Sequence, residues 1–69
     1  MNTIALTVNG APRTLPAATT LDVVVAEVSA ANTGVAAAVN EAVVPRSSWP
    51  ATALGEGDRV EILTAVQGG

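Results

Sequence analysis

The residues best placed to do chemistry are the last two, Gly68 and Gly69. They follow an apolar run from Val60 to Val66, and the first part of this run predicts a strand. Glycine has no Cβ, so a tail ending in glycines can pass close to other backbones. An α-carboxylate becomes reactive once an ATP-using enzyme converts it to an acyl-adenylate. We therefore expect the Gly69 carboxylate to react, on a flexible tail of residues 67–69 that follows a single domain of residues 1–66.

Few side chains compete for a chemical role. The 69 residues include no cysteine, histidine, tyrosine or phenylalanine, and the three basic residues are all arginines. This composition removes thiol and amine nucleophiles and most general bases and metal ligands. We expect no metal, no cofactor bound by this chain and no enzymatic activity of its own.

Charge and hydropathy limit the partners. The net charge is −3, and the arginines are scattered, which argues against nucleic acid binding. No apolar run approaches the ~20 residues of a membrane span, and the N-terminus lacks a signal-peptide pattern. We expect a cytoplasmic protein that does not associate with membranes.

The first part of the chain predicts a hairpin. Residues 3–8 alternate apolar and polar side chains, which is typical of a half-buried strand. Asn9-Gly10 is a strong turn signal. Residues 13–15 are expected to pair back at a sheet edge, because Pro12 and Pro16 cannot donate to a ladder.

A helix is predicted next. Thr19-Thr20 with Asp22 is typical of a helix start, where hydroxyl and carboxylate groups satisfy free N–H groups. Apolar residues then recur at helical spacing, as Leu21, Val24, Val25 and Val28. Asn32 and Gly34 are expected to end the helix in a left-handed cap.

The second part predicts another hairpin, a crossing and a final strand. Residues 35–39 and 42–44 are expected to pair through a turn at Asn40-Glu41. Residues 46–54 suggest an irregular crossing with one helical turn, in which Trp49 covers the core and donates its N–H to a carbonyl, and Arg46 pairs with a carboxylate. Residues 55–58 predict a structural turn, because neither a helix nor a lysine follows to bind phosphate.

This order resembles the β-grasp, or ubiquitin-like, fold, which belongs to the α+β class. The resemblance implies a mixed sheet of four to five strands with one main helix packed across it. The first and last strands would then be central, adjacent and parallel.

Alternation in the last strand also predicts a docking surface. One set of its side chains is expected to face the helix: Val60, Ile62 and Thr64. Leu63 and Ala65 would then be exposed on the opposite face, which Ala36 and Ala38 are expected to share. We predict that these four residues form a partner-docking patch, although single exposed apolar residues are common.

Three segments resemble the ThiS family, the sulfur carrier of thiamine biosynthesis. Residues 38–49 are similar to its V-N-x-x-x-V-P-R-x-x-W signature. Residues 54–62 are similar to its L-x-x-G-D-x-V-E-I segment, and residues 65–69 to its A-V-Q-G-G terminus.

The resemblance implies a mechanism based on partner enzymes. A ubiquitin-activating-like adenylyltransferase would adenylate Gly69 with ATP and magnesium, and Gln67, Gly68 and Gly69 would thread its active site. Sulfur from a cysteine desulfurase or other source would then give a thiocarboxylate. Thiazole synthase would accept that sulfur into the thiazole ring of thiamine.

Other functions remain open at this point. The small subunit of molybdopterin synthase shares the fold and the terminal glycines, and a carrier could serve another sulfur-containing metabolite. The chain could also be a ubiquitin-like binding module with an inert tail.

Overall fold

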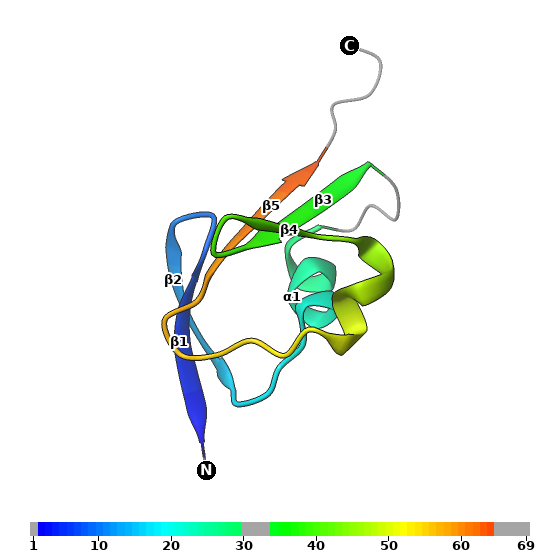
Figure 1. Ribbon diagram of the computed structural model, residues 1–69. Coiled ribbons are helices and arrows are strands. Elements are labelled where there is room, and N and C mark those ends of the chain that lie inside the picture. The colour runs from blue at the N-terminus through cyan, green and yellow to red at the C-terminus, as the bar shows by residue number, and fades with distance from the viewer. Residues whose placement is uncertain (1, 30–33, 65–69) are drawn as a thin grey trace.

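One mixed sheet organises the chain in the computed structural model, which describes residues 2–29 and 34–64. The elements are β1 (Thr3–Val8), β2 (Ala11–Pro16), α1 (Leu21–Val28), β3 (Val35–Val39), β4 (Ala42–Val44), the 3-10 helix η1 (Arg46–Ala51) and β5 (Arg59–Thr64). The five strands lie in the order β2-β1-β5-β3-β4 (Figure 1). β1 and β5 pair in parallel at the centre, and the other neighbours are antiparallel. The predicted β-grasp arrangement is confirmed.

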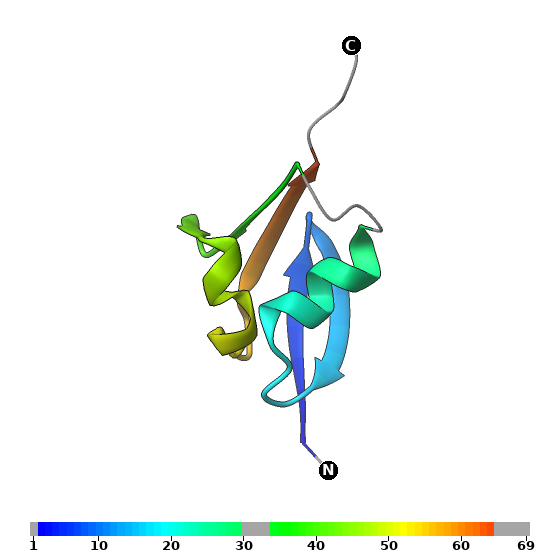
Figure 2. The same ribbon diagram turned by 90° about the vertical axis from the view of Figure 1, so that its right-hand side faces the viewer.

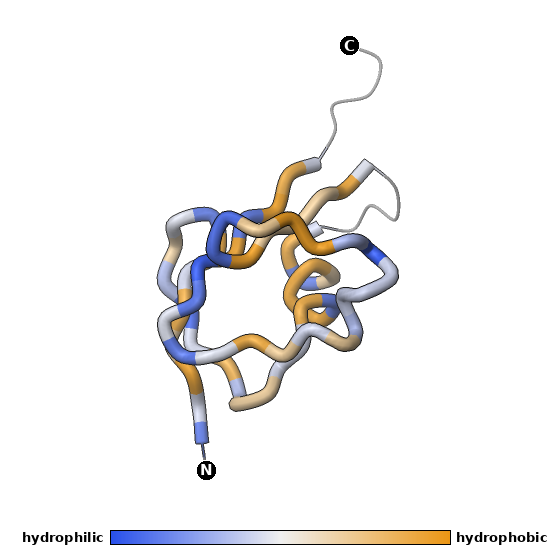
Figure 3. The backbone as a smooth tube through the Cα atoms, in the orientation of Figure 1, coloured by the Kyte–Doolittle hydropathy of each residue, from blue (hydrophilic) through white to orange (hydrophobic). Residues whose placement is uncertain are grey.

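The helices α1 and η1 cover one face of this sheet (Figure 2). The core beneath them is apolar throughout and consists of Ile4, Leu6, Val8, Leu21, Val24, Val25, Ala37, Trp49, Leu54, Val60 and Ile62. Apolar segments run through the strands and α1, whereas polar segments gather at the turns (Figure 3). Alternation in β1 and β5 therefore buries one side of each strand and leaves the other in solvent.

Neither edge strand of the sheet is well suited to pair with a further strand. β2 is longer than the predicted residues 13–15 and contains Pro12 and Pro16, which pair with Thr7 and Thr3. Its edge position tolerates them because a proline without an N–H is permitted where no further strand pairs. The other edge strand, β4, has only three residues. Short and proline-containing edge strands limit pairing with other chains.

The ends of α1 differ from the prediction. Thr20 is the N-cap, but its hydroxyl donates to the Asp22 carboxylate instead of accepting from a backbone N–H. The helix ends at Val28, because Ser29 is extended, with its N–H bonded to the carbonyl of Val25. The predicted cap at Asn32 and Gly34 is therefore wrong. Asn32 lies outside the described residues, and Gly34, with φ +71°, lies at the entrance to β3.

Val28 shows the consequence of this early end. It is 37% exposed, whereas Leu21, Val24 and Val25 are buried as the apolar stripe predicts. The last stripe residue lies in the final helical position and does not reach the core.

The crossing segment contains the predicted helical turn as η1. The Trp49 indole is buried, and its N–H donates to the Val44 carbonyl at 2.9 Å, as expected. Arg46 does not form the expected ion pair within the described residues; its guanidinium carbon lies 6.0 Å from the centre of the Trp49 ring. A guanidinium over an indole face gains a cation–π attraction that competes with a solvent-exposed ion pair.

Truncating a buried valine of α1 should cost much more stability than truncating its exposed neighbour. Val24 is 1% exposed and Val23 is 45% exposed. Val24→Ala should lower the free energy of unfolding by about 2 kcal/mol, because it removes buried methyl groups and leaves a cavity. Val23→Ala should change it by no more than about 0.5 kcal/mol. Urea denaturation of both variants measures the difference, and equal losses would show that α1 does not pack as described.

Candidate functional site

Two residues separate the end of β5 from the predicted reacting residues in the sequence. Gln67, Gly68 and Gly69 lie outside the described residues, as does Ala65 of the predicted docking patch and the boundary between the predicted domain and tail. β5 ends at Thr64, the last residue that the structure describes. The site is therefore built from β5 and from the sheet face around it.

β5 begins from a turn that is bonded to β1. The Glu56 carboxylate accepts the N–H of Ala5 at 2.9 Å, and the Gly57 N–H donates to the Ala5 carbonyl at 2.7 Å. The Asp58 carboxylate accepts the Gly55 N–H at 2.7 Å. Gly57 has φ +81°, a left-handed conformation that glycine adopts without strain. The polar groups of residues 55–58 thus bind the chain itself, which agrees with a structural turn.

Side chains alternate along β5 largely as predicted. Val60 and Ile62 are 1% and 5% exposed, and Glu61 and Leu63 lie on the outer face. Thr64 was expected to face the helix with Val60 and Ile62, but it is exposed. The end of β5 projects beyond the turn that joins β1 and β2, so its last residue has less of the fold beside it (Figures 1 and 2).

The structure brings three residues of the predicted docking patch together. Ala36 pairs with Leu63 across β3 and β5, and Ala38 pairs with Glu61. Cross-strand partners share a face of a sheet, so Leu63, Ala36 and Ala38 all lie on the face away from α1. Leu63 is 70% exposed and Ala36 is also exposed, whereas Ala38 is half-buried.

Sequence reasoning missed a fourth apolar residue of this surface. Val43 of β4 pairs with Ala38 and is 77% exposed. The two-residue turn at Asn40-Glu41 fixes the register of β3 and β4, and counting from it would have placed Val43 beside Ala38. We call Leu63, Ala36, Ala38 and Val43 the apolar patch.

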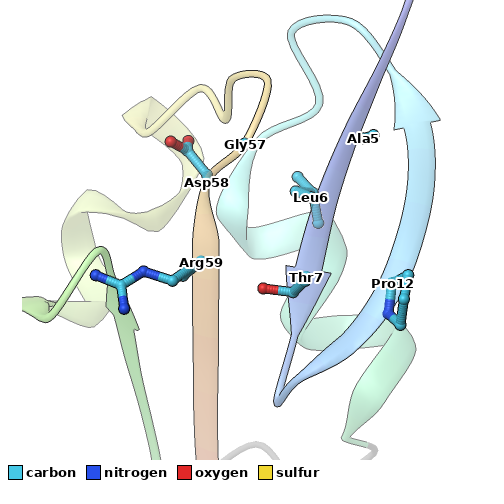
Figure 4. A pocket seen from close by; sticks show the side chains of 7 residues that line it. All are labelled: Ala5, Leu6, Thr7, Pro12, Gly57, Asp58 and Arg59. Atoms are coloured by element: carbon cyan, nitrogen blue, oxygen red, sulfur yellow. The ribbon is translucent and has the colours of Figure 1, made fainter.

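A shallow hollow of about 260 Å³ lies on the outer face at the other end of β5. Its lining residues are Ala5, Leu6, Thr7, Pro12, Gly57, Asp58 and Arg59 (Figure 4). Asp58 already accepts hydrogen bonds from Gly55 and Asn40, and Arg59 lies 3.4 Å from the Glu41 carboxylate. The hollow therefore offers surface shape and no group poised for catalysis.

Two further observations concern the described part of the chain. No group of three or more acidic, histidine or cysteine side chains within residues 2–29 and 34–64 lies close enough to hold a metal ion. Within those same residues, no helix has the length and apolar character needed to span a bilayer.

Comparisons with known proteins agree with this geometry. The ThiS family model matches residues 6–69, which is nearly the whole chain. The crystal structure of the thiamine biosynthesis protein ThiS from Geobacter metallireducens is similar, with a TM-score of 0.74 and 32% sequence identity. The alignment covers 96% of this chain and 100% of that chain. A search of curated proteins gave no match. The chain belongs to the ThiS family, a family of small sulfur carrier proteins.

Proposed function

We propose that this chain carries sulfur for the thiazole ring of thiamine on its Gly69 carboxylate. The observation that supports this proposal most strongly is the family match, which continues through the terminal glycines to residue 69. The position of β5 agrees with it, because the strand that precedes the tail is also the central strand of the sheet. The tail would therefore follow the exposed end of this central strand.

The proposed chemistry has two stages. A carboxylate oxygen of Gly69 attacks the α-phosphorus of ATP on an adenylyltransferase, and pyrophosphate leaves. The terminal sulfur of a persulfide then attacks the acyl carbon, and AMP leaves. A thiol reductant cleaves the resulting acyl disulfide and releases the thiocarboxylate. Thiazole synthase is the proposed acceptor of that sulfur.

The proposed roles of this chain and of its partner enzymes follow from the side chains that this chain has. ATP and magnesium would be bound by the ubiquitin-activating-like adenylyltransferase, and the persulfide by a cysteine desulfurase or another sulfur source. This chain would supply the acyl group and a docking surface. The apolar patch suits that second role, because an exposed apolar surface that includes the strand preceding the tail can bind a partner outside its active site.

Intact mass spectrometry tests the proposed reaction. The chain is incubated with an adenylyltransferase that acts on ThiS-family carriers, ATP, magnesium and a persulfide donor with a thiol. We expect one oxygen of the Gly69 carboxylate to be replaced by sulfur. A matched chain extended by one alanine after Gly69 should stay unchanged, because it no longer presents a glycine carboxylate. An unchanged mass of the original chain beside an active enzyme would overturn the proposal.

A charge in the apolar patch should weaken docking without unfolding the protein. Leu63→Asp places a carboxylate on the patch, and we expect KM for the carrier in adenylation to rise about tenfold or more, as for loss of a central interface contact. Thr14→Asp is the matched control, because Thr14 is exposed on the same sheet face, opposite Ala5 on the β2 edge. It should change KM by less than about twofold. Equal effects of the two substitutions would show that the patch does not bind the partner.

A further inference from the structure

The side chain of Asn9 hydrogen-bonds to the backbone of β5 near its end. The Asn9 Nδ2 donates to the Ile62 carbonyl at 3.2 Å, and the Ile62 N–H donates to the Asn9 Oδ1 at 2.8 Å. The Asn9 backbone N–H also donates to the Val60 carbonyl at 2.8 Å. A side-chain amide carries the same donor and acceptor as a peptide group, so Asn9 binds Ile62 as a strand neighbour would.

This contact extends the short hydrogen-bonded ladder between β1 and β5. β1 and β5 are paired through only two positions, Thr7 with Arg59 and Val8 with Val60. Beyond Val8 the chain turns away into β2 through Asn9-Gly10, with φ of +51° and +82°. The Asn9 side chain therefore occupies the place that the next residue of a longer β1 would fill. Without it, the β1 side of Ile62 would lack this pair of hydrogen bonds.

Asn40 makes a closely matching contact at the other end of β5. It lies in the β3–β4 turn with the same φ of +51°. Its Oδ1 accepts the Arg59 N–H at 3.0 Å, its Nδ2 donates to the Asp58 carboxylate at 3.0 Å, and its backbone N–H donates to the Arg59 carbonyl at 2.8 Å. Asn40 thus binds the first residue of β5, whereas Asn9 binds Ile62, two residues before the strand ends at Thr64.

We propose that Asn9 is a positioning residue for the tail. By hydrogen-bonding Ile62, it fixes the direction and register of the end of β5, from which residues 65–69 continue. A fixed strand end reduces the conformational freedom that must be lost when a partner binds the tail. The functional part of this inference rests on the proposed carrier function. Asn9 acts through β5 and not on the reacting carboxylate.

Two glycine variants separate this role from general stabilisation. Asn9→Gly and Asn40→Gly each remove a side-chain amide, and both keep a residue that adopts positive φ without strain. Both should reduce stability, because each loses side-chain hydrogen bonds to β5. Only Asn9→Gly removes the contact near the tail. Asn40→Gly is therefore the matched control.

Amide hydrogen exchange of the full chain measures how strongly the Asn9 side chain protects the backbone of β5. In Asn9→Gly, the Ile62 amide should exchange about tenfold faster than in the wild type, relative to the amide of Val24 in the core. In Asn40→Gly, the same acceleration should appear at Arg59 and not at Ile62. An Ile62 amide that exchanges at the wild-type rate in Asn9→Gly would overturn the inference.

Adenylation kinetics measure whether the hydrogen bonds between Asn9 and Ile62 affect the carrier function. Pyrophosphate release is followed with an adenylyltransferase that acts on ThiS-family carriers, at a temperature where both variants remain folded. We expect Asn9→Gly to raise KM for the carrier about threefold to tenfold with kcat unchanged, and Asn40→Gly to change KM by less than about twofold. A merely stabilising role would leave KM unchanged in both folded variants, and that result would contradict the proposal.

Two further outcomes are decisive. A raised KM in Asn9→Gly with normal exchange at Ile62 would mean that Asn9 contacts the partner directly, which overturns a positioning role. A wild-type chain that is not adenylated would overturn the carrier function and the kinetic role of Asn9 together, while the exchange result still decides whether Asn9 stabilises the end of β5.

Asn9→Asp keeps the acceptor for the Ile62 N–H and loses the donor. It should fall between the wild type and Asn9→Gly in both measurements, and it replaces Asn9→Gly if that variant fails to fold.

Discussion

The pairing of β5 with both β1 and β3 joins the two halves of the sheet. The β1–β2 hairpin and the β3–β4 hairpin do not pair with each other. β5 lies between them and pairs with both. On one side β5 pairs with β1 over two residues, and on the other it pairs with β3 over five. Its inward side chains, Val60 and Ile62, are both buried in the core. Joining the two hairpins therefore also places the strand that precedes the tail at the centre of the core.

This arrangement separates two tasks by the faces of one sheet. The inner face, under α1 and η1, contains the core, and the described chain has no buried polar or charged residue. The outer face carries the apolar patch and leaves Leu63 in solvent at the end of β5. A partner can therefore bind the outer face while the core remains intact. The proposed chemistry takes place at Gly69, which follows the end of β5 by five residues in the sequence and lies outside the described residues.

Much of this fold could be predicted from local signals, whereas contacts between distant segments could not. Alternation in residues 3–8 and the Asn9-Gly10 turn predicted the first hairpin, and Leu63 was predicted to be exposed from its place in the last strand. The bond from Asn9 to Ile62 joins residues 53 apart, and nothing at either position in the sequence indicates it. Arg46 had a carboxylate and an aromatic ring as possible partners, and only the geometry of η1 decides between them. The end of α1 was misjudged because Gly34, a good cap residue, lies in the entrance to β3 instead.

If the folded body presents the tail to the adenylyltransferase, the whole chain should be a far better substrate than a synthetic peptide of residues 60–69. Both have the same terminal glycines, but the peptide has no sheet and no outer face. Their kcat/KM values for adenylation are compared with one adenylyltransferase that acts on ThiS-family carriers. We expect the value for the peptide to be lower by about a hundredfold or more, because the docking contacts are lost and residues 60–64, which β5 orders in the whole chain, must be ordered on binding. Equal values would show that the fold contributes nothing to presenting Gly69.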